Sequence, residues 1–198
     1  MLYKYISLIM IMCKQCEASS VYEFTNRRKL CKKCFIEYFE KKFFYAIRKF
    51  RMIRDREIIG YRNKGDFRSA VLEKMLGKLS KKLNITFVKL SANKRKTGKT
   101  AVSSAIDFEA GRIVSNLING KLRKEFSPVN GKIIKPLYLF LDEEVLLYAK
   151  LTGLKFKKQK EKNKRDKIPD FLDELEKKHP EIKRSIVNGL LTLHQNSK

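Results

Sequence analysis

The sequence has no cysteine after residue 34, only two histidines, and no hydrophobic run of membrane-spanning length. Its first twelve residues are apolar, but a spanning helix needs about 20 such residues. No small-residue cleavage site follows them, so they do not form a complete secretion signal. Met12 is an alternative start, with residues 1–11 lying upstream of the protein proper. We therefore expect a cytoplasmic protein that makes no use of a membrane.

Acidic side chains are also scarce, with 21 Asp and Glu against 46 Lys and Arg, for a formal net charge of +25. Such an excess indicates a polyanionic partner, and nucleic acid is the first expectation. A membrane surface is the alternative, but the basic residues are spread over several segments and not confined to one amphipathic helix. A generally basic proteome would account for part of the charge. The 198 residues suffice for one ordinary domain and a small appendage.

All four cysteines lie in two Cys-x-x-Cys pairs separated by fourteen residues, namely Cys13, Cys16, Cys31 and Cys34. Each two-residue gap lets one tight turn direct both sulfurs at a single tetrahedral ion, so the spacing predicts a zinc ribbon. Neighbouring lysines favour the thiolate form that zinc requires. Disulfides, iron–sulfur ligation and free thiols are the alternatives. Four thiolates leave no open coordination position, so the metal should be structural. His179 and His194 are expected at the surface or at helix ends.

Hydrophobic periodicity predicts an α/β fold with a helical C-terminus. Expected strands cover 21–24, 58–62, 85–90 and 133–138, and a polar loop covers 91–104. Expected helices run over 35–54, 66–83 with Asp66 as N-cap, 107–119 and 143–152, and two more begin at Pro169 and Pro180. The predicted organisation is a zinc ribbon at 12–35, a linking helix with a Rossmann-like domain at 36–154, and a basic segment with C-terminal helices at 155–198.

A Gly-Lys-Thr triplet at 98–100 resembles the end of a P-loop, but Asn93 stands where that motif needs its first glycine. We expect a cationic loop near a phosphate backbone instead. Phosphate contacts position a nucleic acid without selecting its bases, and they weaken steeply with salt. The predicted RNA-binding residues are Arg27, Arg28 and Lys29 beside the cysteines, and Lys94, Arg95, Lys96 and Lys99 in the loop.

Several segments, in this order, resemble the tRNA 2-thiouridine synthetases of the PP-loop ATPase superfamily, of the TtuA type and its eukaryotic cytosolic relatives. The cysteine pairs and the phenylalanine-rich segment after Cys34 match that family's start. Ile106-Asp107-Phe108-Glu109-Ala110 is similar to its Leu-Asp-Asp-Glu-Ala helix start, and Asn116–Gly120 to its Asn-Leu-Leu-x-Gly end. Further similar segments are Ile59–Arg62, Lys135–Tyr138, Glu144–Ala149, Asp170–Glu176 and Lys178–Pro180.

The resemblance implies a PP-loop ATPase fold and a reaction in which ATP adenylates a tRNA uridine before sulfur replaces oxygen. The family's Ser-Gly-Gly-Lys-Asp-Ser loop holds the ATP phosphates on backbone N–H groups, and its inner cysteines ligate an iron–sulfur cluster or handle sulfur. This chain has neither, nor the family's C-terminal zinc cysteines. We expect the first strand, the loop, its helix and the second strand to be deleted. Asp107 matches a position near the family's nucleotide, but we expect it to act as a helix N-cap.

Three functional hypotheses follow. The first is a tRNA-binding, zinc-containing member that lacks independent ATP-dependent thiolation. The second is an active sulfurtransferase completed by a separate PP-loop subunit. The third is a non-enzymatic zinc-ribbon protein that binds ribosomal RNA. Because a shortened sheet would leave an exposed edge, a catalytic subunit or a second copy of the chain is an expected partner.

Overall fold

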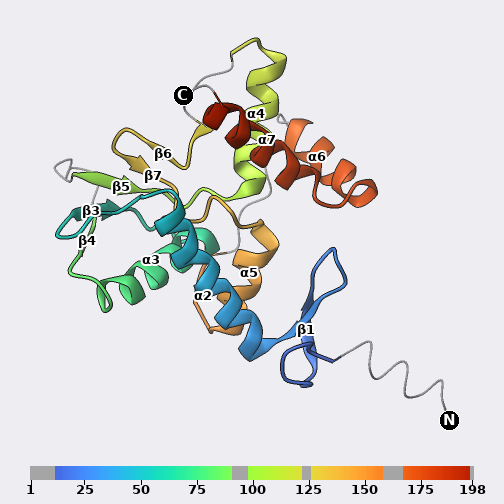
Figure 1. Ribbon diagram of the computed structural model, residues 1–198, viewed down its shortest axis with the longest axis horizontal. Coiled ribbons are helices and arrows are strands. Elements are labelled where there is room, and N and C mark those ends of the chain that lie inside the picture. The colour runs from blue at the N-terminus through green and yellow to red at the C-terminus, as the bar shows by residue number, and fades with distance from the viewer. Residues whose placement is uncertain (1–11, 91–97, 122–125, 158–166, 197–198) are drawn as a thin grey trace. The chain divides into compact units, whose positions relative to one another are not determined.

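The computed structural model describes residues 12–90, 98–121, 126–157 and 167–196, which are drawn in colour in Figure 1. The chain forms two compact units, Met1–Lys42 and Phe43–Lys198. The predicted loop residues Lys94, Arg95 and Lys96 lie outside the described residues, as do residues 1–11. Within the described ranges, no helix has both the length and the apolar character needed to cross a bilayer.

The first unit is a two-stranded hairpin followed by the start of a long helix. Strand β1 (Ser20–Glu23) pairs antiparallel with β2 (Lys29–Cys31), and Met12 bridges to Ser19. The rings of Tyr22 and Phe24 on the hairpin contact Phe35 and Tyr38 on the helix, with centroids 4.9–5.0 Å apart. These aromatic contacts give a very small unit an apolar interior. The hairpin confirms the predicted strand at 21–24 and adds β2.

Helix α2 (Lys32–Lys49) starts in the first unit directly after β2 and ends in the second unit. It begins three residues earlier and ends five residues earlier than the predicted 35–54. Because it starts at Lys32, Cys34 lies in its first turn. Phe35, Phe39 and Phe43 lie on the buried face of this helix and are fully buried.

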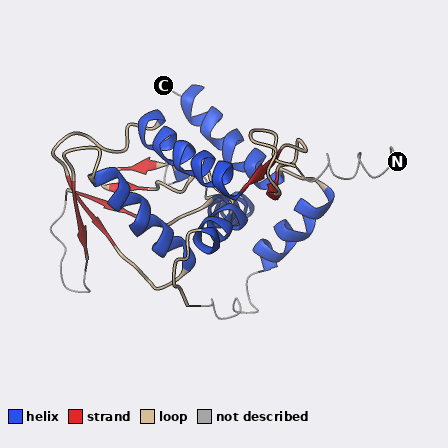
Figure 2. Cartoon of the chain, turned by 90° about the horizontal axis from the view of Figure 1, so that it is seen from below, coloured by secondary structure: helices blue, strands red, loops and turns tan. Residues whose placement is uncertain are grey.

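The second unit contains a five-stranded sheet with the order β4-β3-β5-β7-β6. Strands β3 (Ile58–Tyr61), β4 (Thr86–Lys89), β5 (Lys99–Ala101) and β7 (Ile133–Ile134) are parallel, and β6 (Val129–Asn130) pairs antiparallel with β7. Figure 2 shows these strands as the larger group of red arrows. The chain moves from β3 to β4 on one side and then returns to β5 on the other side. The sheet order therefore reverses between β3 and β5.

Two predictions about this sheet are wrong. Strand β5 lies inside the predicted loop 91–104, and β7 covers only two of the six residues predicted at 133–138. The strand, helix and strand predicted at 58–62, 66–83 and 85–90 are found, because β3 leads through a short loop into α3 (Phe67–Ser80) and then into β4. The expected deletion of an earlier unit of this kind stays a prediction. The α/β class itself is confirmed.

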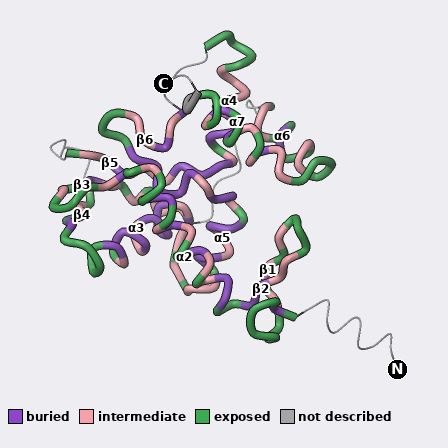
Figure 3. Tube along the Cα trace, viewed as in Figure 1, coloured by how far each residue is buried: buried purple, intermediate pink, exposed green. Residues whose placement is uncertain are grey.

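The other helices of the second unit form its core together with the sheet. Helix α3 packs on α5 (Asp142–Leu151), while α4 (Ile106–Ile118) packs on α6 (Lys167–Lys178) and α7 (Ile182–Asn196). Leu172 of α6 and Val187 of α7 are almost fully buried in this cluster. Figure 3 colours the buried residues of the second unit purple. The predicted C-terminal segment 155–198 thus contributes two helices to the core of the second unit.

Two predicted helix caps have different outcomes. Asp66 caps α3 as predicted, because its side chain accepts a hydrogen bond from the backbone N–H of Ser69 at 2.7 Å. Asp107 does not cap its own helix, since α4 begins at Ile106 and its N-cap is Ala105. The prediction for Asp107 was wrong because the helix starts one residue earlier than expected.

Candidate metal centre and sheet-edge cavity

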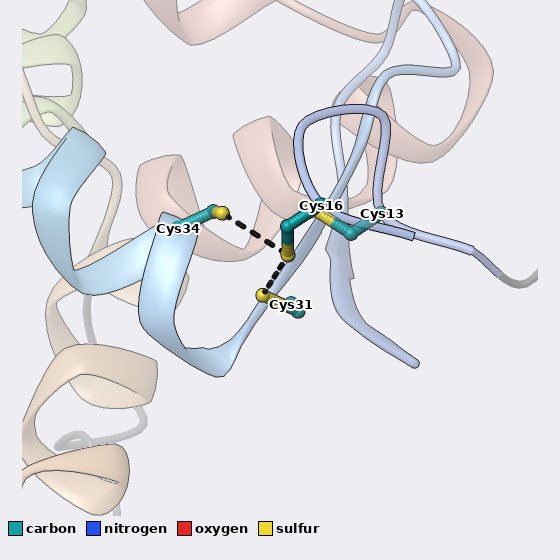
Figure 4. A group of neighbouring side chains, drawn as sticks. All are labelled: Cys13, Cys16, Cys31 and Cys34. Atoms are coloured by element: carbon teal, nitrogen blue, oxygen red, sulfur yellow. Dashed lines mark hydrogen bonds between the residues drawn. The ribbon is translucent and has the colours of Figure 1, made fainter. Parts of the chain in front are cut away.

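The four cysteine side chains of the first unit converge on one point, as Figure 4 shows. All four sulfur atoms lie within 4.8 Å of one another, and Cys16 Sγ is 3.3 Å from Cys31 Sγ and 3.5 Å from Cys34 Sγ. Four thiolates around one tetrahedral ion at a metal–sulfur distance of about 2.3 Å would be about 3.8 Å apart. The predicted convergence is confirmed, and the donor set and the spacing fit a metal ion.

The local backbone explains how the sulfurs meet. The first pair sits in the turn between Cys13 and the hairpin, where the N–H of Glu17 donates to the carbonyl of Cys13 at 3.0 Å. The second pair joins the end of β2 to the first turn of α2. The four cysteines differ in exposure, because Cys16 is exposed whereas Cys13, Cys31 and Cys34 are buried.

The thiols of the cluster differ in their readiness to ionise. Burial raises the pKa of Cys13, but backbone N–H groups of the cluster outweigh burial and lower this pKa to about 6. Burial and the neighbouring cysteines raise the pKa of Cys34. Crowded thiolates repel one another, so a bound cation is needed before all four ionise together.

The three basic residues predicted to bind RNA beside the cysteines lie at the hairpin turn and the start of β2. Arg27 is exposed and adopts a left-handed φ of 61° in the turn. Arg28 places its guanidinium 4.2 Å from the centroid of the Phe24 ring, and Lys29 pairs with Glu23 at 3.1 Å. Among the described residues, the Nε atom of Arg28 is buried without a hydrogen-bond partner. Their role in RNA binding stays a prediction.

Lys99 lies in β5 and is the only described one of the four loop residues predicted to bind RNA. Its amine donates to the carbonyl oxygen of Met52 at 2.9 Å and pairs with Glu57 at 2.9 Å. The side chain is only 19% exposed. This amine is already bonded within the second unit, so the geometry argues against the predicted phosphate contact.

Three backbone N–H groups in the loop between β3 and α3 and the first turn of α3 are bonded to side-chain oxygens. The side-chain oxygen of Asn63 accepts a hydrogen bond from the N–H of Gly65 at 2.7 Å. The hydroxyl of Ser69 accepts from the N–H of Lys64 at 3.1 Å, and the carboxylate of Asp66 accepts from the N–H of Ser69. Such groups at a helix start commonly bind anions. Here, side-chain oxygens of the chain occupy them.

A cavity of about 530 Å³ opens at the carboxyl ends of β3 and β5, where the sheet order reverses. In open α/β sheets this is the usual place for a ligand. Lys64 and Asp66 line it from the loop after β3, and Ser103 and Ser104 line it from the segment after β5. Phe108, on the first turn of α4, also lines the cavity and is 54% exposed. This cavity was not predicted, because the polar sequence of β5 does not indicate a strand.

A buried ion pair lies at the inner end of this cavity. Glu109 is fully buried, and its carboxylate accepts hydrogen bonds from Lys135 Nζ at 2.8 Å and from the Ser104 hydroxyl at 2.5 Å. Glu109 comes from α4, Lys135 from the turn after β7 and Ser104 from the segment after β5. Charged residues inside a helical pattern carry no sequence signal of burial, so this pair was not predicted.

Asp107 joins three helices. Its carboxylate accepts a hydrogen bond from the N–H of Asp142 at the start of α5, and it pairs with Lys183 of α7 at 2.7 Å. Lys183 also pairs with Asp173 at 2.6 Å and Glu176 at 2.9 Å. Burial lowers the pKa of Lys183, but these carboxylates outweigh burial and raise it. The geometry assigns Asp107 a bonded position between helices.

No protein-family model matches the chain, and no curated protein matches its sequence. Its fold matches a solved structure described as the U34-tRNA thiolase NcsA from Methanococcus maripaludis with its 4Fe–4S cluster. The match has a TM-score of 0.72 and 20% identity, and it covers 92% of this chain and 87% of that chain. At this identity the likeness shows the fold. This chain therefore has the α/β fold of a tRNA thiolase, together with a four-cysteine cluster that fits a metal.

Proposed function

We propose that this protein is a cytoplasmic, tRNA-binding relative of the tRNA thiolases that holds a structural zinc ion and lacks independent ATP-dependent thiolation. The observation that carries the proposal is a fold like that of a thiolase in which backbone N–H groups between β3 and α3 donate hydrogen bonds to side-chain oxygens of the same chain. The net charge of +25 supports a polyanionic partner.

We propose that the loop between β3 and α3, and not a deleted segment, is the counterpart of the phosphate-binding loop of PP-loop ATPases, because it joins an inner strand of the sheet to the start of a helix. Where that family has Ser-Gly-Gly-Lys-Asp-Ser, this chain has Lys64-Gly65-Asp66-Phe67-Arg68-Ser69. One glycine and the final serine are retained, but the lysine position holds Phe67, whose side chain is buried. Asp66 adds a carboxylate that would repel phosphate. Both changes disfavour a bound triphosphate.

The amino-acid sequence at the start of α4 also disfavours a bound triphosphate. Phe108 stands where the family's Leu-Asp-Asp-Glu-Ala has its second aspartate, so this chain has lost a carboxylate suited to a divalent cation. The two retained acidic residues, Asp107 and Glu109, are bonded to Lys183 and Lys135. No cysteine occurs in the second unit to handle sulfur.

Zinc is proposed for the four-cysteine cluster because all four sulfurs approach within 4.8 Å. A single tetrahedral ion requires such proximity. In a 4Fe–4S cluster each cysteine binds a different iron, which requires a wider separation of the sulfurs. A cytoplasmic location keeps the thiols reduced and available to the metal.

Equilibrium binding of the full chain to tRNA, a ribosomal RNA fragment and duplex DNA, measured over a range of salt concentrations, tests the proposal. We expect tighter binding to tRNA and a steep salt dependence for every polyanion. Equal affinity for tRNA and the ribosomal fragment would contradict the proposal and favour the ribosomal hypothesis.

A second assay tests the catalytic part of the proposal. The chain is mixed with tRNA, ATP, Mg²⁺ and a sulfur donor, with and without a PP-loop protein, and thiolated uridine is quantified by mass spectrometry. We expect no product from the chain alone. Product from the chain alone would contradict the proposal. Product only with the second protein would instead favour an active enzyme completed by a separate subunit.

A further inference from the structure

We propose that the cavity between the carboxyl ends of β3 and β5 binds the base of one unpaired RNA nucleotide, which stacks on Phe108, and that this cavity does not bind a triphosphate. This inference rests on the proposed RNA-binding function. It goes further because it assigns the ligand class of a cavity in the second unit and identifies the side chain that recognises it.

The shape and position of the cavity suit a ligand the size of one nucleotide. Its volume of about 530 Å³ falls within the range of about 300–1,000 Å³ typical of small-molecule sites. It lies at the point where the sheet order reverses, which is the favoured ligand position in open α/β sheets. Loops after two neighbouring strands therefore supply its walls.

Two apolar side chains that line the cavity are exposed to solvent. Phe108 is 54% exposed, and Ile133, which also lines the cavity, is 42% exposed. The guanidinium of Arg112 lies 5.8 Å from the Phe108 ring centroid. Proteins that bind unpaired nucleotides place bases on exposed aromatic rings and arginine planes of this kind. A base stacked on Phe108 would cover apolar surface that the chain leaves exposed.

The polar groups of the cavity suit the edge of a base. The Ser104 hydroxyl donates to Glu109 at 2.5 Å, and a hydroxyl that donates one hydrogen bond can still accept another. The adjacent Ser103 is partly buried and lines the same cavity. Hydroxyls can donate or accept, so they tolerate more than one base. We therefore expect weak base preference.

The charged groups that line the cavity favour a single nucleotide of RNA over ATP. Lys64 and Arg112 line the cavity and can attract the phosphate on either side of one nucleotide, whereas Arg68, which also lines it, pairs with Asp142. A triphosphate would instead need several free N–H groups at the start of α3, and those of Lys64, Gly65 and Ser69 are bonded to side-chain oxygens. The carboxylate of Asp66 stands at the same place. The cavity thus offers stacking and dispersed positive charge without a phosphate-binding loop.

The test uses the full chain and an RNA hairpin that carries 2-aminopurine as an unpaired loop base, with a fully paired duplex of the same length for comparison. Binding should quench the loop fluorophore. Phe108→Ala should weaken hairpin binding by about 5- to 100-fold, the range expected for one stacked base, and should leave duplex binding unchanged. Phe108→Tyr should retain hairpin binding, because it keeps an aromatic ring.

Phe171→Ala is the matched control, since Phe171 is 57% exposed on α6 and does not line the cavity. It should leave binding to the hairpin unchanged. Equal effects of Phe108→Ala and Phe171→Ala, or displacement of the hairpin by ATP with Mg²⁺, would overturn the inference. If tRNA remains the preferred ligand while Phe108→Ala has no effect, only the inference fails. Absence of any preference for tRNA identifies failure of the proposed function itself.

Discussion

The carboxylate of Asp107 accepts a hydrogen bond of 2.7 Å from the backbone N–H of Asp142, 35 residues further along the chain. The same carboxylate pairs with Lys183, so it connects the starts of α4 and α5 with α7. Each of its two oxygens therefore has a partner within the protein. In this chain its role is to hold three helices together.

Replacing Asp107 with alanine should lower the free energy of unfolding by about 1–3 kcal/mol, because two hydrogen bonds to a charged group are lost. Chemical denaturation followed by circular dichroism measures the change. Asp55→Ala is the control, since Asp55 has a side chain that is 70% exposed. A change below about 0.5 kcal/mol, within the range of ordinary surface substitutions, would contradict the structural role of Asp107.

The buried pair of Glu109 and Lys135 should show strong coupling. Glu109→Ala should destabilise the protein by about 3–5 kcal/mol, because it leaves the amine of Lys135 buried without its main counter-charge. The double variant Glu109→Ala with Lys135→Met should recover much of this loss, because it also removes the unpaired amine. A double-mutant cycle from denaturation midpoints measures the coupling. Additive effects of the two single substitutions would show that the pair is not coupled.

The metal centre should contain one zinc ion per chain. Cys34→Ser should abolish metal retention, because three thiolates no longer close the tetrahedral shell. Elemental analysis measures the ion, and amide exchange over β1 and β2 measures the loss of local structure. A strong chelator should have the same effect on the unsubstituted chain. Iron in place of zinc, with the visible absorption of an iron–sulfur cluster, would contradict the prediction.

The sequence was sufficient to predict the four-cysteine cluster because ligand spacing is a local property. The two Cys-x-x-Cys pairs each require only one turn, and the structure brings their four sulfurs together. The helices were also predictable, since their buried faces repeat every three to four residues. The cap at Asp66 was correct for the same reason, because its bond reaches only three residues along the chain.

The features that were predicted incorrectly depend on contacts between residues that are far apart in the sequence. Strand β5 has only three residues, Lys99-Thr100-Ala101, and its pairing with β3 and β7 compensates for its polar sequence. Lys99 looked like a free cation, but its partners Met52 and Glu57 lie more than forty residues earlier.

Acid should remove the stabilising effect of Glu73. Burial raises the pKa of this carboxyl, but hydrogen bonds from Asn63, Tyr61 and Lys89 outweigh burial and lower the pKa below its usual 4.5. A lowered pKa in the folded protein means that the contribution is complete above pH 4.5 and is lost as the pH falls through the folded value. Glu73→Gln should cost about 1 kcal/mol at pH 7.

Below the folded pKa of Glu73, the difference in stability between Glu73→Gln and the unsubstituted chain should disappear. Urea denaturation at several pH values between 3 and 7 measures it. Glu174→Gln serves as the control, since Glu174 is exposed on α6. A difference that stays constant down to pH 3 would show that the charge of Glu73 does not stabilise the fold.

Substitution of Lys99 and substitution of Lys94, Arg95 and Lys96 should have different effects on the salt dependence of RNA binding. Changing Lys94, Arg95 and Lys96 together to alanine should make the plot of log affinity against log salt shallower by about 2–3, if each residue neutralises one phosphate. Lys99→Ala should leave this slope unchanged, because the amine is bonded to Met52 and Glu57, and should instead lower the free energy of unfolding. Filter binding to tRNA at four or more salt concentrations measures the slopes.

An unchanged slope in the triple variant would show that residues 94–96 do not contact the RNA phosphates. A slope reduced by Lys99→Ala, in a protein that remains folded, would show that the amine leaves Glu57 to bind phosphate.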